Sequence, residues 1–268
     1  MDELKDFVEK CNWDLLNCSD KESKKAIEYL FDCRKLNIDS IKLHKIGYCH
    51  EKFKIPDCIR FFGQKESKKN KWDMSTKING HIILPIYSEM GNLNAFATRI
   101  PINESGYPWW NLPKPFHKGN YLFLLDKAKK TIFNKNKVYI VEGYIDALTL
   151  FQHGLKNVVA IMGTAYTLRK LALTIRYCNN VCLCFDSDKN RSGDKAKNLS
   201  IAILNKYAFC ESISSIDSLP LGDDPASFVS KNGIGSFLER ERILDDEEII
   251  KICHEVSKGN DRRLLDAK

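Results

Sequence analysis

From residue 137 onward, short runs of apolar and β-branched residues alternate with longer amphipathic segments. The apolar runs cover residues 138–142, 157–161, 181–185 and 209–216. Between them, apolar residues recur at helical spacing, for example at Leu168, Leu171 and Ile175, with Thr167 placed to cap that helix. Strands that alternate with helices are typical of a mostly parallel sheet flanked by helices. We therefore expect an α/β fold in this half of the chain.

The N-terminal part of the chain shows a mixed pattern. Ser19 or Asp20 is placed to cap a helix whose apolar residues recur every three or four positions. Further on, strand-like runs at residues 81–87 and 93–99 flank a turn that contains Gly91–Asn92, a pair suited to positive φ. These features predict an α+β subdomain with a β-hairpin.

Changes of pattern divide the chain into three parts. We expect an N-terminal α+β subdomain at residues 1–130, an α/β domain at 131–232 and a short helical segment at 233–268. A proline- and aromatic-rich link covers residues 101–115. The lysine-rich stretch at 64–71 is either a solvated loop or a patch that attracts phosphate.

The chain is moderately basic. It has 268 residues, a net charge of +7, a pI near 8.8 and 43% hydrophobic residues. The hydrophobic fraction is enough for a folded core. The positive charge is common among nucleic-acid-binding proteins, but it also occurs in ordinary soluble proteins. Charge alone therefore leaves both classes open.

The ten cysteines do not form a metal motif. No Cys-x-x-Cys pair occurs, and no histidine stands at zinc-finger spacing from a cysteine pair, so we expect no zinc site. Scattered thiols without a signal peptide favour a reducing compartment. No apolar run reaches the roughly 18 residues of a membrane span. We expect a cytoplasmic protein that does not contact a membrane.

Acidic residues follow two of the predicted strands. Glu142 ends the first strand, and Asp186 and Asp188 follow the third. Ligand sites of open α/β sheets lie at the carboxyl ends of the strands. Two carboxylates about 4 Å apart repel by roughly 4 kcal/mol at a dielectric of about 20, so the group requires a cation. An all-oxygen ligand set suits Mg²⁺ or Mn²⁺, which predicts metal-dependent phosphoryl transfer.

Asp146 lies four residues after Glu142, so both carboxylates can share one face at the start of a helix. Its alternative role is to cap that helix. Gly143 and Gly163 fit tight turns where the backbone approaches a phosphate, or turns with a purely structural role. Trp109 and Trp110 could stack on bases or pack in the interior.

Three segments resemble the TOPRIM signature, which DnaG-type primases share with topoisomerases and several nucleases. They are Glu142–Asp146 (EGYID), Ile161–Ala165 (IMGTA) and Asp186–Asp188 (DSD). Flanking segments at 82–99, 116–122 and 219–229 are similar to those of DnaG-type primases, and the resemblance extends over about residues 25–240. The flanking segments favour the primase branch.

The resemblance implies a TOPRIM domain, preceded by the α+β subdomain, that synthesises short RNA primers on a DNA template. It implies Mg²⁺ or Mn²⁺ as cofactor. The implied partners are single-stranded DNA, ribonucleoside triphosphates, a replicative helicase and a zinc module supplied in trans. The catalytic and metal-binding residues it implies are Glu142, Asp186, Asp188, Asp146 and Asp224. The implied nucleic-acid or nucleotide contacts are Arg99, Asn111, Lys118, Gly143, Gly163 and Thr164.

The sequence departs from the primase pattern in several places. It shows no N-terminal cysteine/histidine zinc module and only residues 233–268 beyond the TOPRIM segment. Ala226 replaces an aspartate of the family, Trp109 replaces a lysine, and the loop from Asp188 to Gly193 is longer than usual. These departures suggest a compact, divergent primase core of phage or plasmid origin.

Three other functions could draw on the same sequence features. A TOPRIM nuclease would use the same acids to admit water in place of a 3′ hydroxyl, and the acids alone do not distinguish it from a primase. A binding module without catalysis is disfavoured by the intact acids. A topoisomerase is disfavoured because the chain is short and offers no recognisable nucleophilic tyrosine.

Overall fold

The chain forms two compact units, Met1–Phe116 and His117–Lys268. The computed structural model describes residues 2–56, 59, 78–101, 109–113, 116–163, 166–186, 192–216, 219–220 and 222–258. The predicted domain boundaries at 130/131 and 232/233 stay predictions.

The first unit combines helices with an antiparallel sheet. Its described helices are α1 (Asp2–Asn17), α2 (Lys21–Glu28), the π-helix η1 (Tyr29–Cys33) and α3 (Ile38–Leu43). Its strands are β1 (Gly47–Cys49), β2 (His81–Tyr87), β3 (Leu93–Arg99) and β4 (Trp110–Leu112), in the order β1-β2-β3-β4. The predicted hairpin is confirmed as β2 and β3, and Gly91 takes φ +83° in its turn.

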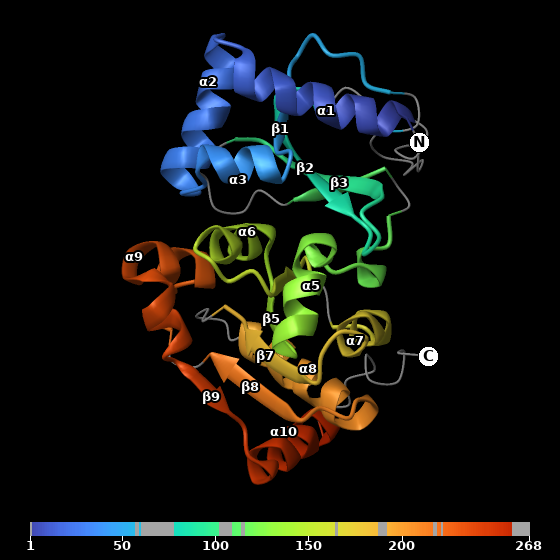
Figure 1. The fold of residues 1–268 in the computed structure, drawn as a ribbon, viewed down its shortest axis with the longest axis vertical. Helices are drawn as coiled ribbons and strands as arrows, with labels where there is room; N and C mark the ends of the chain where they lie inside the picture. Colours follow the sequence, from blue (N-terminus) through green and yellow to red (C-terminus); the bar gives the residue numbers. More distant parts are fainter. Residues whose placement is uncertain are drawn as a thin grey trace. The chain divides into compact units, whose positions relative to one another are not determined.

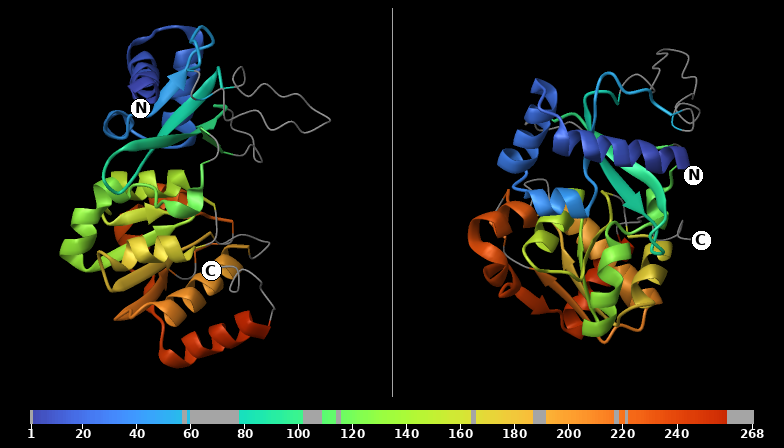
Figure 2. Two further views of the ribbon diagram at one scale, coloured as in Figure 1. Left: turned by 90° about the vertical axis from the view of Figure 1, so that its right-hand side faces the viewer. Right: turned by 45° about the horizontal axis from the view of Figure 1, so that its top comes forward.

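Helix α1 covers one face of this sheet (Figure 2). Phe7 and Cys11 of α1 are buried with Ile83 and Phe96 of the strands. A Cβ atom at Gly47 of β1 would lie 2.6 Å from the Cys11 backbone, so only glycine permits this close approach. The predicted cap of α2 is confirmed at Asp20, whose carboxylate accepts the N–H groups of residues 22 and 23.

The second unit is built on a five-stranded sheet. Its described helices are η4 (Lys118–Asn120), α5 (Leu125–Lys135), α6 (Tyr144–Gln152), α7 (Leu168–Ile175), α8 (Ser192–Tyr207), α9 (Pro225–Leu238) and α10 (Asp246–Lys258). Its strands are β5 (Lys137–Val141), β6 (Val158–Ala160), β7 (Asn180–Cys184), β8 (Ser212–Ile216) and β9 (Glu241–Ile243). The strand order is β6-β5-β7-β8-β9. All pairs are parallel except β8–β9, which confirms the predicted α/β fold.

Helices flank both faces of this sheet, because the strand order turns back after β6. Strand β6 lies on one side of β5, and β7 lies on the other side. Right-handed crossovers place the helix between β5 and β6 on one face and the next two helices on the other. One face carries the main core, in which apolar residues of α5, α7, α8 and α10 pack on β5, β7 and β8 (Figure 1). None of the described helices is long and apolar enough to cross a membrane.

The segment after residue 233 forms more than the predicted helix. Helix α10 is present, but β9 also adds an antiparallel edge strand to the sheet. The three residues of β9 are too few and too polar to give a strand pattern in the sequence. Glu241 of β9 accepts hydrogen bonds from Lys137 and Tyr139 of β5 and from Ser214 of β8. This carboxylate therefore ties the C-terminal segment to the parallel strands.

Replacing Glu241 with alanine should destabilise the second unit. The change leaves an ammonium and two hydroxyls without their acceptor. We expect a loss of about 1.5–3 kcal/mol in the free energy of unfolding, measured by denaturant titration at pH 7. Burial raises the pKa of Glu241, but its three hydrogen bonds outweigh this effect and lower the pKa below its ordinary value of 4.5. This contribution should therefore be present above pH 4.5 and disappear as the pH falls further.

The exposed pair Glu9–Lys45 provides the control. Glu9→Gln should cost less than about 1 kcal/mol, because water screens this pair. Equal losses in the two variants would contradict the structural role of Glu241.

Candidate metal and nucleotide site

Two of the predicted acids meet at the carboxyl ends of neighbouring strands. Strands β5 and β7 run parallel, with Val141 beside Cys184. Glu142 follows Val141 directly, and Asp186 comes two residues after Cys184. The backbone N–H of Asp186 donates a hydrogen bond of 3.2 Å to Oε1 of Glu142. The structure thus brings Glu142 and Asp186 together, whereas Asp188 lies outside the described residues.

A glycine at the start of α8 leaves room for this pair. A Cβ atom built on Gly193 would overlap the backbone carbonyl oxygen of Asp186 and lie 3.1 Å from Oε1 of Glu142. Gly193 is buried. The sequence showed this glycine only as the end of a long loop, because its contact with Glu142 depends on how α8 packs. Any larger residue would displace one of the two acids.

Asp146 joins the N-termini of two helices. It is the third residue of α6 and is buried. Its Oδ1 accepts the N–H of Ala226 in α9 at 3.1 Å, and the carboxylate also accepts the backbone N–H of Gly143 at the start of α6. A Cβ atom at Gly143 would lie 2.5 Å from Oδ2 of Asp146. The capping role considered for Asp146 is therefore present, and it extends to a second helix.

The electrostatics of Asp146 show that several carboxylates gather here. Burial raises the pKa of Asp146 well above its ordinary range, and the carboxylates of Asp224 and Asp186 raise it further. The two N–H groups act in the opposite direction. An ionised cluster of this kind is unfavourable unless a cation balances it. The oxygen donors and the space kept open by Gly193 fit a hard divalent cation.

Asp224 has a structural role of its own. It caps α9 and accepts the N–H of Ser227 at 2.6 Å, which forms a capping box. Asp223 pairs instead with Lys231 at 2.8 Å. Of the acids in this segment, Asp224 is therefore the one whose charge reaches Asp146.

The loop after β6 borders Glu142. The N–H of Gly163 donates to the backbone carbonyl of Glu142 at 3.0 Å. Met162 and Gly163 take positive φ values of 62° and 66°. The predicted tight turn is therefore present at Gly163, while Thr164 lies outside the described residues.

Lys118 lies in η4, which is fixed to helix α7. The hydroxyl of Thr167, which caps α7, donates to the carbonyl oxygen of Gly119 at 2.6 Å. Lys118 is partly buried, and this burial lowers its pKa. Lys118, a predicted nucleic-acid or nucleotide contact, thus stands on a defined backbone within the second unit.

The remaining predicted contacts lie in the first unit. Asn111 of β4 pairs with Ala97 of β3, so its side chain shares a face of the sheet with that of Arg99. Burial lowers the pKa of Arg99, the nearby Tyr29 raises it and the Arg34 guanidinium lowers it. Arg34 donates from Nε to the Tyr29 hydroxyl at 2.7 Å. Arg34 carries no signal in the sequence, since no local pattern connects η1 to the end of β3.

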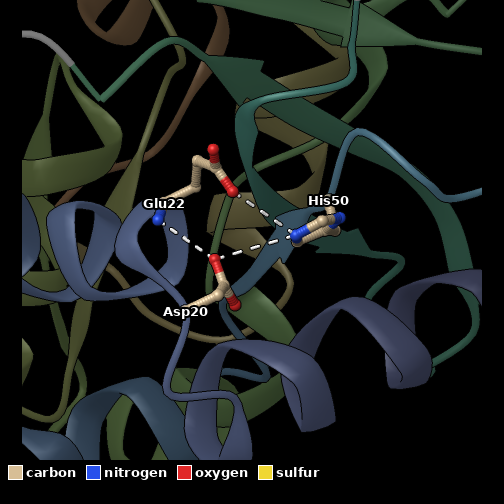
Figure 3. A group of neighbouring side chains, drawn as sticks. All are labelled: Asp20, Glu22 and His50. Carbon is tan, nitrogen blue, oxygen red and sulfur yellow. Dashed lines mark hydrogen bonds and ion pairs between the residues drawn. The ribbon is translucent and has the colours of Figure 1, made fainter.

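A second group of potential ligands lies at the start of α2 (Figure 3). Histidine, cysteine, aspartate and glutamate can each offer one ligand atom to a metal. Within the described part of the chain, only Asp20, Glu22 and His50 bring three such atoms within 4.8 Å of one another. His50 Nε2 lies 3.7 Å from Asp20 and 3.5 Å from Glu22. Its Nδ1 accepts the N–H of Lys52, so the ring hydrogen resides on Nε2 and points toward the carboxylates. With its N–H facing the two carboxylates, this tautomer of His50 does not offer Nε2 as a metal ligand. The expected absence of zinc stays a prediction.

Comparison with known proteins supports a particular family. Residues 139–229 match the family described as Toprim-like. The DNA primase of Clostridium acetobutylicum is 28% identical over 266 residues, which cover 88% of this chain and 43% of the relative. The DNA primase of Campylobacter jejuni is 30% identical over 225 residues, covering 79% and 36% respectively. The chain thus spans less than half the length of these curated relatives.

Solved structures show the same fold. The zinc-binding and RNA polymerase domains of the Aquifex aeolicus primase match with a TM-score of 0.74 at 24% identity, over 99% of this chain and 66% of that chain. A DnaG primase catalytic domain bound to single-stranded DNA matches with a TM-score of 0.68 at 24% identity, over 89% of this chain and 80% of that chain. The chain is therefore similar to DnaG-type primases over most of its own length, has the fold of their catalytic core, and carries a Toprim-like region at residues 139–229.

Proposed function

We propose that the chain is the catalytic core of a DNA primase, which makes short RNA primers on single-stranded DNA by metal-dependent nucleotidyl transfer. The contact between Glu142 and Asp186 at adjacent strand ends carries this proposal. It lies within the Toprim-like region of a chain that is similar to DNA primases over most of its own length.

The proposed cofactor is Mg²⁺, or Mn²⁺ in its place. Glu142, Asp186 and Asp188 would hold it, with Asp146 and Asp224 alongside. When bound, such an ion activates an attacking hydroxyl and stabilises the charge on the leaving pyrophosphate. Mg²⁺ retains several waters in protein sites, which suits acids that do not all converge on one point.

The protein's own residues orient this chemistry. The Asp186 N–H fixes the direction of the Glu142 carboxylate, and Gly193 keeps other side chains away from both acids. Glu142 is placed to accept the proton of the 3′ hydroxyl or to bind the ion directly. Asp146 adds negative charge from a position that the two helix N-termini fix.

The proposed substrates are ribonucleoside triphosphates and a single-stranded DNA template. We assign Lys118, Gly143, Gly163 and Thr164 to nucleotide contacts beside the acids, and Arg99 and Asn111 to nucleic-acid or nucleotide contacts in the first unit. The partly buried guanidinium of Arg99 and its neighbour Arg34 support a phosphate-binding role.

Further partners follow from the same assignment. We propose a replicative helicase and a zinc module in trans as partners, and action in the cytoplasm of a bacterial host on behalf of a phage or plasmid. The alternative of a TOPRIM nuclease is not favoured, because the curated relatives described above are DNA primases.

Replacing Glu142 with glutamine should abolish primer synthesis while leaving the fold intact. The change keeps the side-chain size but removes the charge and the proton acceptor, and we expect a rate loss of about 10²–10⁴-fold. The assay combines single-stranded DNA, labelled ribonucleotides and Mg²⁺ or Mn²⁺, with Glu9→Gln as control. Full activity in Glu142→Gln would refute the role of Glu142. Cleavage of DNA without synthesis would replace the primase assignment with a nuclease.

Substituting alanine for Gly193 should damage the site sterically. The new methyl group would displace Asp186 or Glu142, at a cost of about 1–3 kcal/mol in stability. Because a misplacement of about 1 Å can cost roughly 100-fold in rate, we expect a loss of that order in primer synthesis.

Gly235 of α9 is the matched control for Gly193. A Cβ atom there would meet nothing within 4 Å. Gly235→Ala should therefore preserve activity and add up to about 1 kcal/mol to stability. Equal activity in the two alanine variants would contradict the proposed contact of Gly193 with the acids.

Replacing Asp146 with asparagine should stabilise the metal-free protein at neutral pH. The raised pKa of Asp146 means that its contribution to stability is present in acid and is lost as the pH rises through the folded-state pKa. Asparagine avoids this loss and can still accept one N–H. We expect a higher melting temperature than wild type at pH 7, by about 2–4 °C for each kcal/mol gained, and a smaller difference in acid.

Metal provides the second arm of this experiment. Mg²⁺ should raise the melting temperature of the wild type more than that of Asp146→Asn, because ligand binding stabilises the folded state. The same Mg²⁺ response in both proteins would argue against a place for Asp146 in the metal site.

A further inference from the structure

A fully buried lysine lies beside the proposed site. Lys170 is the third residue of α7 and is 0% exposed. Its Nζ donates a hydrogen bond of 2.7 Å to the backbone carbonyl of Ile161, just after β6. The sequence presented Lys170 as one polar position in an amphipathic helix. Its burial follows from the packing of α7 against the loop after β6.

This lysine is costly for stability. Burial, together with a smaller effect of the nearby charge of Lys118, lowers the pKa of Lys170 to about 7. Charged groups are rarely fully buried, and apolar residues of similar volume are often neutral or stabilising in such positions. A buried charged group that breaks this rule beside a cluster of acids is a candidate for a functional role.

The bond to Ile161 fixes the loop that borders Glu142. The N–H of Ile161 donates to Val141 of β5, so Lys170 secures the other side of the same peptide segment. Met162 follows with φ 62°, a conformation that non-glycine residues adopt only when their surroundings hold them. The N–H of Gly163 then donates to the carbonyl of Glu142. The Lys170 bond therefore stabilises a turn that is connected to the catalytic strand end.

Lys170 also adds charge at the same corner of the second unit. Thr167 links α7 to η4, which carries Lys118, and the Lys118 charge is close enough to act on Lys170. Two neighbouring ammonium groups repel each other, and an anion relieves that repulsion. The phosphates of a nucleoside triphosphate, the substrate of the proposed function, are anions of this kind.

We propose that Lys170 is a positioning residue for the nucleoside triphosphate: its buried ammonium holds the loop Ile161–Gly163 in place and adds positive charge behind Lys118. This inference rests on the proposed function. It assigns Lys170 no contact with the substrate, since the side chain is closed off from solvent.

Two substitutions separate the bond from the charge. Lys170→Met removes both, and Lys170→Gln removes the charge but keeps an N–H donor. For Lys170→Met we expect the KM for ribonucleoside triphosphates in primer synthesis to rise at least about tenfold, in line with the loss of a charged hydrogen bond. The Kd for single-stranded DNA should stay unchanged, and the melting temperature should stay equal or rise. Lys170→Gln should give an intermediate KM.

Lys156 provides the matched control. Its Nζ also donates to a backbone carbonyl, that of Phe151, at 2.7 Å. It precedes β6, at the edge of the sheet opposite Glu142. Lys156→Met should leave the KM unchanged.

Three results would overturn the proposal: a wild-type KM in Lys170→Met, an equal rise in KM in Lys156→Met, or a parallel loss of melting temperature and DNA binding. The last result would show a structural role only. If the wild type makes no primers, the proposed function fails, and equilibrium binding of ATP with Mg²⁺ still tests Lys170. Equal ATP affinity in wild type and Lys170→Met would then overturn the inference by itself.

Discussion

The parallel pairing of β5 with β7 is the constraint on which the site depends. Its register places Val141 beside Cys184, so Glu142 and Asp186 leave the sheet at the same edge. The hydrogen bond from the Asp186 N–H to Glu142 then fixes their separation. A slip of one residue would turn these side chains to opposite faces and separate them. Around this pair, α6 and the start of α9 add the carboxylates of Asp146 and Asp224, and α8 adds Gly193.

Much of the second unit could be predicted from the sequence because its buried strands are almost continuous apolar runs. Such runs mark parallel strands directly, and the acids that end them mark the edge where ligands bind. The starts of two helices could also be predicted, because a single capping side chain marks each of them. These are Asp20 at α2 and Thr167 at α7. These features depend on neighbours in the sequence.

The features that the sequence did not reveal depend on tertiary contacts. Strand β9 is only three residues long, and the hydrogen bonds of Glu241 attach it to the sheet. Gly193 and Lys170 belong to helices with ordinary patterns, and only packing places them against Glu142 and Ile161. Asp146 presented two alternatives, a cap or part of the acidic site. The structure gives it the cap and also places it near Asp186 and Asp224.

The buried charged groups of the second unit affect stability in two opposite ways. Glu241 is satisfied by three donors, which lower its pKa and make it a stabilising link. Burial raises the pKa of Asp146 and lowers the pKa of Lys170, so in both cases it favours the neutral form. Keeping either group charged therefore lowers the stability of the fold. Both of these costly groups lie around the ends of β5, β6 and β7. The fold is therefore less stable at the strand ends where a bound cation would balance the carboxylates and where phosphates would balance the lysines.

The most direct test of this account is the position of a bound metal ion. Crystals of the protein grown or soaked with Mn²⁺ would reveal the ion by its anomalous scattering. We expect an anomalous peak between Glu142 and Asp186, at the carboxyl ends of β5 and β7, that disappears in Glu142→Gln. A peak only at Asp20, Glu22 and His50, or no peak at the strand ends at saturating Mn²⁺, would contradict it.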